Sequence, residues 1–323
     1  MKKIVLFDPS CGTLNAGDYI ISNAARSEMR NIIKDSFVLT VSTHNPILTT
    51  TQQLHAGKQS KYFSDADLKF LLGSNILKPN MLHLHNDWNM DIFDCKPYKN
   101  VILVGAGFDG DTSRTNLYTK LIYKKILNKE ITHSVRDKKT EQFLKGMGFK
   151  AINTGCPTIW QLTKEHCTKI PKKKSKDVVF TLTDYRKDLS NDQSLINILQ
   201  KNYNKLYFWI QGSEDLDYLK SLKNTNNIEL IAPSFEAYKA FLETHDCDYV
   251  GTRLHAGIQA MRCYKRSVIL IVDNRARDMK ETYNLPAIER NRIQELDSII
   301  NSRFSTDVEI DEQRIAKWKE QFE

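Results

Sequence analysis

Residues 247–257 have the sequence CDYVGTRLHAG, and this stretch decides the fold class. The first four residues form a short, mainly apolar run that predicts a buried β-strand. Gly251 then predicts a turn, and a helical pattern begins around His255. A strand that runs through a tight turn into a helix is the repeating unit of α/β proteins with parallel sheets.

The same alternation of strands and helices extends through the rest of the chain. Strands are predicted near residues 3–8, 37–42, 81–85, 101–105, 131–135, 150–154, 178–182, 205–210, 228–231, 247–251 and 267–272. Helices are predicted near residues 17–34, 64–74, 115–128, 137–147, 192–203, 214–223, 234–244, 255–263 and 291–301. This order predicts an α/β fold whose parallel strands are joined by right-handed crossovers.

The length of 323 residues predicts two domains, because a single core stops growing near roughly 250–300 residues. A polar, lysine-rich linker around residues 169–176 supplies the boundary. We therefore expect an N-terminal Rossmann-like domain over residues 1–170 and a second one over 171–303. Residues 304–323 are expected to form a closing helix that packs back on the body.

The composition narrows the class of partner. A net charge of +8 favours anionic ligands, such as phosphorylated metabolites, lipid diphosphates or an anionic membrane surface. The basic residues form no aromatic-interleaved patch, so nucleic acid is the least favoured partner. The lysines of residues 172–176 are more simply a solvated linker. The six cysteines lack any CxxC pair, which argues against a metal cluster or a disulfide framework.

No apolar run approaches the roughly 18 residues of a membrane span. The apolar run of residues 4–7 is too short for a signal peptide and predicts a first strand instead. We therefore expect a cytoplasmic protein, with contact at the inner membrane face as a further hypothesis.

Residues that follow strands carry the most functional weight, because ligands of parallel sheets bind beyond the carboxyl ends of the strands. Asn15 and Asp18 follow the first strand and open a helix. A helix N-terminus suits an anion, although simple capping explains these residues equally well.

Residues 105–110, GAGFDG, match the glycine spacing of a dinucleotide site. Asp109 and Asp111 would repel a pyrophosphate there, and the next helix begins too late, near Ser113. A glycine-rich loop lining a cleft, with Gly105 and Gly107, is the better interpretation.

His83 and His85 end another predicted strand and could share one face. A metal site needs further ligands that the sequence does not clearly supply, so we expect no metal. His85 is retained as a cleft-lining candidate.

Arginines at strand ends point to an anionic ligand. Arg136 follows one strand, Arg253 another, and Arg275 and Arg277 a third. An arginine offers a planar fork of donors to carboxylate or phosphate, although each could instead pair with a nearby acid. His255 lies two residues after Arg253 and could move a proton near neutral pH.

Taken in order, these segments resemble the polysaccharide pyruvyl transferase family. The resemblance rests on residues 15–18, 134–137, 154–157, 211–215, 251–257 and 273–277. It spans about residues 15–280, and the GTRLHAG segment is its most specific part.

The resemblance implies a GT-B-like fold, with two Rossmann-like domains facing a cleft. It also implies transfer of a pyruvyl group from phosphoenolpyruvate to a sugar of a cell-surface polysaccharide or of its lipid-linked precursor, forming a cyclic ketal. The N-terminal domain would serve the acceptor and the C-terminal domain the donor. Phosphoenolpyruvate would be the co-substrate, with no cofactor required.

By motif, Arg136, Arg253 and His255 carry over as donor-site residues, joined by Arg275 or Arg277. We assign His255 as the catalytic general acid. The acceptor or cleft-lining candidates are Asn15, Asp18, Gly105, Gly107, His85, Asp184 and Gln211.

Other functions fit parts of the pattern. A GT-B nucleotide-sugar glycosyltransferase would use the same strand ends for a nucleotide diphosphate. An oxidoreductase rests only on the flawed glycine pattern. A non-catalytic anion-binding component of a polysaccharide assembly complex would need neither Arg253 nor His255 for its activity.

Overall fold

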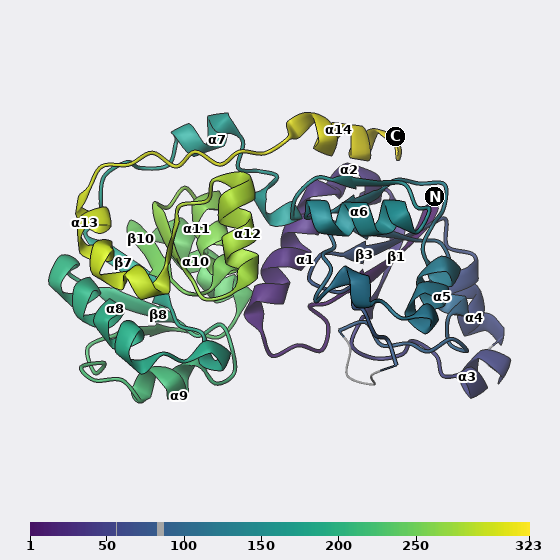
Figure 1. Cartoon of the computed structure of the whole chain (residues 1–323), viewed down its shortest axis with the longest axis horizontal. Coiled ribbons are helices and arrows are strands. Elements are labelled where there is room, and N and C mark those ends of the chain that lie inside the picture. Colours follow the sequence, from purple (N-terminus) through teal and green to yellow (C-terminus); the bar gives the residue numbers. More distant parts are fainter. Residues whose placement is uncertain (56, 83–86) are drawn as a thin grey trace. The chain divides into compact units, whose positions relative to one another are not determined.

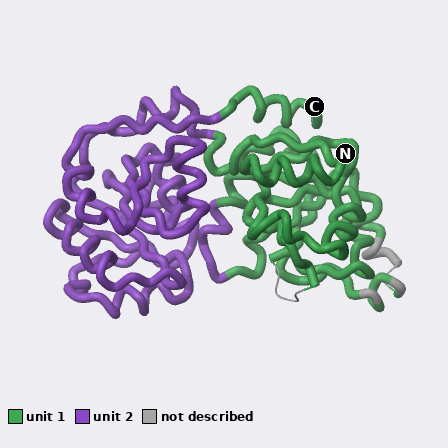
Figure 2. The backbone as a smooth tube through the Cα atoms, viewed as in Figure 1, with its two compact units in different colours: residues 1–13, 21–160, 311–323 green, residues 14–20, 161–310 purple. Residues whose placement is uncertain are grey.

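The structure is a computed structural model, and it describes residues 1–55, 57–82 and 87–323. The chain divides into two compact units, which are coloured separately in Figure 2. Unit 1 comprises residues 1–13, 21–160 and 311–323, and unit 2 comprises residues 14–20 and 161–310. The chain therefore enters unit 2 for one turn of its first helix before it completes unit 1. The predicted assignment of one domain to the acceptor and the other to the donor stays a prediction.

Unit 1 is built on a parallel sheet with the strand order β2-β1-β3-β4. Its strands are β1 (Lys2–Asp8), β2 (Ser36–Ser42), β3 (Leu68–Leu72) and β4 (Val101–Val104), and the short pair β5 (His133–Val135) and β6 (Ala151–Asn153) follows. Gly105 N donates to Ser134 O at 3.0 Å and Arg136 N to Ala106 O at 3.1 Å, so β5 continues the sheet beside the end of β4.

The helices of unit 1 connect these strands (Figure 1). They are α1 (Ala16–Glu28), α2 (Arg30–Ile33), α3 (Thr50–His55), α4 (Gly57–Ser64), η1 (Lys96–Tyr98), η2 (Thr112–Arg114), α5 (Leu117–Ile126), α6 (Lys138–Gly146), η3 (Pro157–Ile159) and α14 (Glu312–Glu320). The predicted closing helix over residues 304–323 is shorter in the structure: α14 covers Glu312–Glu320, whereas residues 303–311 are not helical. Trp318 of α14 and Phe322 just after it are buried and pack against Phe70.

Unit 2 contains a six-stranded parallel sheet with the order β12-β11-β10-β7-β8-β9. Its strands are β7 (Asp177–Thr181), β8 (Leu206–Trp209), β9 (Glu229–Ile231), β10 (Cys247–Gly251), β11 (Ser267–Ile271) and β12 (Ala287–Glu289). The chain first moves outward from β7 to β9 and then returns to the other side of β7 as β10. This is the strand order of the Rossmann fold, and its topological switch point lies between β7 and β10.

The helices of unit 2 are α7 (Lys164–Thr168), η4 (Asp184–Arg186), α8 (Leu189–Asn202), α9 (Asp215–Lys220), α10 (Phe235–Thr244), α11 (Leu254–Arg262), α12 (Asn274–Tyr283), η5 (Arg290–Glu295) and α13 (Leu296–Asn301). Side-chain caps fix several of their starts: Asp188 accepts from Asn191 N, Ser234 from Ala237 N, and Asp273 from Ala276 N. Such caps satisfy backbone donors that a helix start leaves unpaired. Within the described part of the chain, every helix is too short or too polar to span a membrane.

One predicted helix is wrong. Residues 64–74 were expected to be helical, but Leu68–Leu72 form β3 between β1 and β4. Phe70, Leu71 and Leu72 are all buried, so both faces of this strand meet apolar neighbours. A short continuous apolar run fits a buried strand and a buried helix equally well, and only pairing with β1 decides between them.

The strand predicted near residues 81–85 is not seen in its described part, because residues 81 and 82 form a turn. Residues 83–86 lie outside the described residues, and His83 and His85 are among them. The sequence also missed several elements, namely α3, α4, α7, α12 and β12.

Candidate functional site

The carboxyl ends of β7 and β10 meet at the switch point of unit 2. The hydroxyls of Thr183 and Thr252, which follow these strands, lie 2.8 Å apart, and both residues are buried. Arg253 comes next after Thr252. Its backbone N donates to Thr181 Oγ1 at 3.3 Å. The sequence therefore places Arg253 at the point where α/β sheets bind ligands.

Arg253 is held by two carboxylates and a carbonyl. Its Nε donates to Leu182 O at 3.0 Å, and its Nη2 bonds Asp184 Oδ1 at 3.0 Å and Asp215 Oδ1. The side chain is only 3% exposed. The predicted donor-binding arginine is therefore buried in an ion-pair cluster.

Arg253 is the cation that lies between the two carboxylates of this cluster. Burial acts to lower the pKa of Arg253, but the neighbouring charge and hydrogen bond of Asp215 raise it above its ordinary value. Arg253 therefore stays protonated. Gly212 makes the cluster sterically feasible, because a Cβ at this position would overlap Arg253 Nη2.

Asp215 connects the arginine to the first turn of α1. Its Oδ2 accepts from Gln211 N at 3.2 Å and from Gly212 N at 2.7 Å. Gln211 in turn accepts from Ala16 N through its backbone oxygen at 2.8 Å. Its Nε2 donates to Asn15 Oδ1 at 2.9 Å. The structure thus brings Asn15, Asp184, Gln211 and Arg253 together.

Asp18 lies in the same first turn of α1 and is half-buried. Its backbone N donates to Asn15 O at 3.1 Å. Gly17, between them, has no room for a side chain, since a Cβ would lie 2.6 Å from Gln211 Nε2. A larger residue at position 17 would therefore force the Gln211 side chain to move away from Asn15.

His255 is the second residue of α11, is half-buried, and has a buried Nδ1. The helix start that carries it is fixed from several sides. Tyr249 OH donates to Arg253 O at 2.8 Å, and Tyr238 OH donates to Ala256 O at 3.0 Å. A Cβ on Gly257 would lie 2.6 Å from Ile269, so α11 packs directly on the sheet. The imidazole therefore sits on a rigid element beside Arg253.

Arg275 is more accessible than Arg253, and its side chain is 39% exposed. Its Nε and Nη2 bond Asp273 Oδ2 at 3.0 and 2.6 Å, and its Nη2 also donates to Tyr185 OH at 3.2 Å. The guanidinium of Arg253 lies 5.0 Å from the centre of the Tyr185 ring. Tyr185 thereby links the buried arginine to the exposed one.

Burial acts to lower the pKa of Arg275, but Asp273 raises it overall. Arg277, two residues on, makes different contacts. It bonds both carboxylate oxygens of Glu289 at 2.8 and 2.9 Å and Asn274 Oδ1 at 2.7 Å. These contacts tie Arg277 to Glu289 of β12 and to its own helix.

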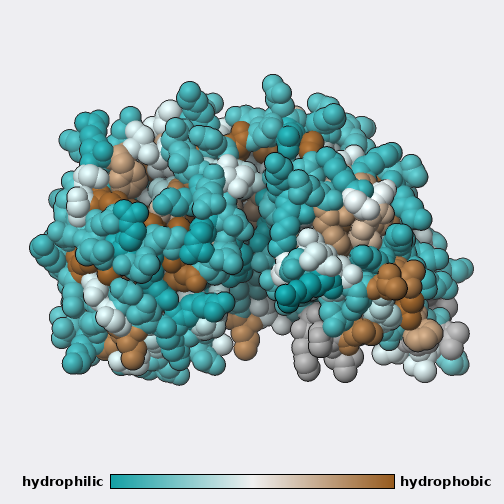
Figure 3. Space-filling view, in the orientation of Figure 1, coloured by the Kyte–Doolittle hydropathy of each residue, from teal (hydrophilic) through white to brown (hydrophobic). Residues whose placement is uncertain are grey.

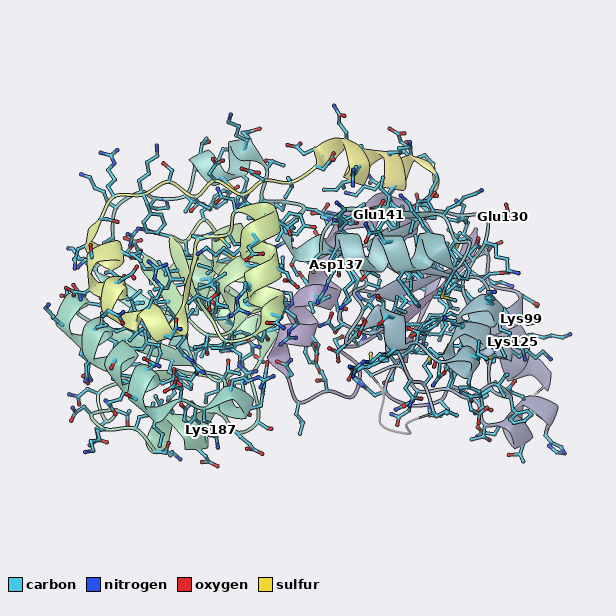
Figure 4. All side chains as sticks on the ribbon, in the orientation of Figure 1. Lys99, Lys125, Glu130, Asp137, Glu141 and Lys187 are labelled. Atoms are coloured by element: carbon cyan, nitrogen blue, oxygen red, sulfur yellow. The ribbon has the colours of Figure 1, made fainter. Side chains whose placement is uncertain are left out.

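Unit 1 holds the remaining predicted residues. Arg136 follows β5, its side chain is 12% exposed, and its Nε lies 3.7 Å from Asp137 Oδ2. Asp137, labelled in Figure 4, also caps α6 by accepting from Thr140 N at 2.7 Å. A Cβ on Gly107 would overlap Arg136 Nε, so this glycine lets the arginine lie against the loop.

Gly105 has a φ of +63°, and a Cβ there would overlap Pro157. The loop from Gly105 runs through η2 before α5 begins at Leu117. Gly110 therefore does not open a helix, which separates this loop from the dinucleotide-binding pattern.

Sequence reasoning missed two residues that organise the site. Asp215 lies in the quoted segment 211–215, and Tyr185 directly follows Asp184. Asp215 follows β8 and Tyr185 follows β7, so their position after a strand was the one signal in the sequence that could have identified them. Their contacts with Arg253 and Arg275 depend on the strand order of the sheet, which brings distant segments together and cannot be derived from the local sequence.

Solved structures share this architecture. Staphylococcus aureus MnaA in a structure with UDP matches with a TM-score of 0.52 and 11% identity, over 98% of this chain and 95% of that chain. The Methanocaldococcus jannaschii UDP-GlcNAc 2-epimerase, in complex with UDP-GlcNAc and UDP, matches with a TM-score of 0.52, 11% identity and 98% coverage of both chains. The Neisseria meningitidis UDP-GlcNAc 2-epimerase bound to UDP-GlcNAc has a TM-score of 0.51 and 11% identity, over 99% and 98%.

At this identity the likeness shows the fold, and it confirms the predicted GT-B-like α/β class with parallel sheets. No curated protein sequence matches the chain significantly. The family model for polysaccharide pyruvyl transferases matches residues 15–274, a span that runs from Asn15 in the first turn of α1 to the start of α12. The chain therefore belongs to the polysaccharide pyruvyl transferase family.

Proposed function

We propose that this protein transfers the pyruvyl group of phosphoenolpyruvate to two hydroxyls of a sugar in a cell-surface polysaccharide or its lipid-linked precursor. The product is a cyclic ketal. Membership of the family supports pyruvyl transfer. The single observation that supports a donor site is the cluster at the β7–β10 switch point, where two arginines and a histidine lie on rigid elements.

The donor carries a carboxylate and a phosphate, so its site needs cationic forks. Arg275 suits direct contact because it is part-exposed and, among the described residues, pairs with a single carboxylate, that of Asp273. Arg253 has both Asp184 and Asp215 and is buried, so its proposed contribution is to position the site. Arg136 of unit 1 remains a proposed donor contact. Of the two arginines of α12, we assign the donor contact to Arg275, because Arg277 bonds both carboxylate oxygens of Glu289.

The chemistry balances with residues of these types. A sugar hydroxyl oxygen bonds C2 of the donor and gives up its own proton to a base, while C3 gains a proton, which converts the methylene into a methyl group. The C2–O bond to phosphate then breaks, and inorganic phosphate leaves. A second hydroxyl oxygen closes the ring at C2 and releases its proton. We assign the C3 proton to His255, and arginines stabilise the departing phosphate.

The acceptor side is proposed from the remaining polar groups near strand ends. In unit 2 these are Asn15, Asp18, Asp184 and Gln211, and in unit 1 they are Gly105 and Gly107. His85 keeps its place in this proposal, although it lies outside the described residues.

Titration calorimetry with phosphoenolpyruvate tests the donor. We expect saturable binding to phosphoenolpyruvate and none to UDP-GlcNAc or other nucleotide sugars tested in parallel. Binding to a nucleotide sugar instead would replace pyruvyl transfer with glycosyl transfer.

His255→Ala tests the proton transfer. Phosphate release from phosphoenolpyruvate, measured with a panel of methyl hexosides as acceptors, should fall by about 10²–10⁴-fold while donor affinity stays. His245→Ala is the matched control, since His245 is exposed at the end of α10. Equal turnover of wild type and His255→Ala would show that His255 does not supply the C3 proton.

A further inference from the structure

Strand β2 forms an open edge of the sheet in unit 1. It pairs with β1 over all seven residues, and it stands last in the strand order. Among the described residues no strand pairs with its outer side. Its sequence, SFVLTVS, contains no charged residue, proline or glycine. An unprotected edge of this kind is a template for pairing with another strand.

The side chains of this edge are apolar and exposed. Phe37 is 67% exposed, and Val38 and Leu39 are each 39% exposed. Beside them lies a groove of about 370 Å³, walled by Tyr62 and lined by Lys3, Val5, Phe37, Leu39 and Ala66. The face drawn in Figure 3 is mainly hydrophilic, with its hydrophobic residues in scattered patches.

The edges of the unit 2 sheet are protected in the usual manner. Strand β9 has three residues, and its Glu229 pairs with Lys205 at 3.4 Å. Strand β12 also has three residues, and its Glu289 pairs with Arg277 at 2.8 Å. Short, charged edges resist strand addition, whereas the long and uncharged β2 does not.

We propose that β2 pairs antiparallel with β2 of a second copy of this chain, joining two unit 1 sheets across a two-fold axis. A two-fold contact must be self-complementary. Strand β2 meets this condition, because apolar and small polar residues are placed symmetrically about Leu39. With the axis at Leu39, that residue faces its own copy and Phe37 faces Val41. Val38 then faces Thr40, and Ser36 faces Ser42, so the two copies of β2 place no charged side chains opposite each other.

The open backbone distinguishes this partner from a membrane. The unpaired N–H and C=O groups along the outer side of β2 would lose their hydrogen bonds in hydrocarbon. A partner strand satisfies them and covers the apolar side chains at the same time. The edge therefore fits a strand better than a lipid surface.

The available area is sufficient for a dimer. Phe37 and Tyr62 at 67% and 60% exposure offer roughly 250 Å² per chain if each ring carries about 200 Å². The rest of β2 and the groove add a similar area, which brings the pair to on the order of 1,000 Å². That is close to the minimum of about 1,000 Å² expected of a biological interface and below the roughly 1,200–2,000 Å² of standard ones.

Sedimentation velocity of the full chain at micromolar concentration tests the pairing. We expect twice the monomer mass of 37.4 kDa. Leu39→Lys should give the monomer mass, because it places two like charges at the axis. Leu230→Lys, on the exposed edge strand β9, should leave the mass unchanged. A monomeric wild type, or a dimer that survives Leu39→Lys, would overturn the proposal.

Leu39→Cys separates loss of pairing from loss of folding. Residues opposite one another in antiparallel strands lie about 4.5–5.5 Å apart, within the reach of a disulfide. Mild oxidation should link this variant into a covalent dimer but leave Leu230→Cys and wild type as single chains on a non-reducing gel. Failure of Leu39→Cys to cross-link would contradict the register. A monomeric wild type that sediments with anionic phospholipid vesicles would assign the edge to a membrane instead.

Discussion

In unit 2 the end of β10 is held by charges, whereas in unit 1 the seam between β4 and β5 is held by neutral hydrogen bonds. Arg253 is buried between Asp184 and Asp215. In unit 1, Gly105 N donates to Ser134 Oγ at 2.9 Å, and His133 Nδ1 accepts from Leu103 N at 3.1 Å. Two Rossmann-like sheets thus secure comparable strand ends with different chemistry.

This difference predicts how the stability of each region responds to mutation and to pH. A charged cluster resists small changes of pH, but removing one member leaves a buried charge without a partner. A neutral seam has no such charge to expose. It is destabilised instead at low pH, when a buried hydrogen-bond acceptor such as His133 Nδ1 becomes protonated. The two units should therefore respond differently to mutation and to acid.

Arg253→Ala should give the largest effect. It leaves Asp215 buried beside Asp184 without their cation, and breaking a buried pair in this way costs about 3–5 kcal/mol of unfolding free energy. Urea unfolding at pH 7 measures the loss. If the midpoint stays where it is while phosphoenolpyruvate binding disappears, Arg253 acts as a direct donor contact and the positioning role fails.

Arg266→Ala is the matched control for this experiment. Arg266 pairs with Asp248 at 2.8 Å and is equally buried, but its contacts lie with Phe304 and residues 299–302. We expect a similar loss of stability. The folded fraction of this variant should still bind phosphoenolpyruvate with wild-type affinity.

Acid should destabilise the chain through His133. Burial lowers the pKa of His133 from 6.5 to about 4, and its Nε2 contacts Asn128 O at 2.9 Å. The unfolded chain therefore binds the proton first as the pH falls. The stability from this residue is complete above pH 6.5 and is lost between 6.5 and about 4. The loss reaches about 3 kcal/mol at the lower limit.

Urea unfolding at a series of pH values from 4.5 to 7.5 measures this slope. His133→Asn should be less stable than wild type at pH 7 but should lose less on acidification. His55→Asn changes an exposed histidine of the same unit and should keep the wild-type slope. A His133→Asn slope as steep as that of wild type would assign the acid response to other groups.

Much of this organisation could be predicted from the sequence. Strand β10, the turn at Gly251 and the start of α11 follow directly from local pattern. The meeting of residues 211–215 with 251–255 follows from the rule that parallel strands share a carboxyl edge. Local pattern therefore located the candidate site.

The state of Arg253 could not be predicted. Its carboxylate partners lie 38 and 69 residues away along the chain, so no spacing rule connects them. Helix α12 is not among the predicted helices: the sequence marks Arg275 and Arg277 only as strand-end arginines suited to an anionic ligand, whereas Asp273 caps a helix that begins at Asn274. Strand β3 was taken for a helix because burial on both faces removes the alternation that identifies a strand.

The smallest expected effect distinguishes the two arginines of α12. Arg275 touches Tyr185, which lies under Arg253, whereas Arg277 is held by Glu289. Arg275→Ala should weaken phosphoenolpyruvate binding by about 10–100-fold, because a hydrogen bond to a charged group contributes about 1.5–3 kcal/mol. Its unfolding free energy should change by less than about 1 kcal/mol, because the pair with Asp273 is partly solvated.

Arg277→Ala is the matched control, since it removes an arginine of similar exposure from the same helix. Its donor affinity should stay within about threefold of wild type, because its ion pair with Glu289 leaves the Arg253–Tyr185–Arg275 series intact. Calorimetric titration of both variants with phosphoenolpyruvate shows which substitution weakens donor binding more. A larger loss of affinity in Arg277→Ala would move the donor to the Glu289 side of α12. The chain of contacts from Arg253 through Tyr185 would then stabilise the fold without reaching the substrate.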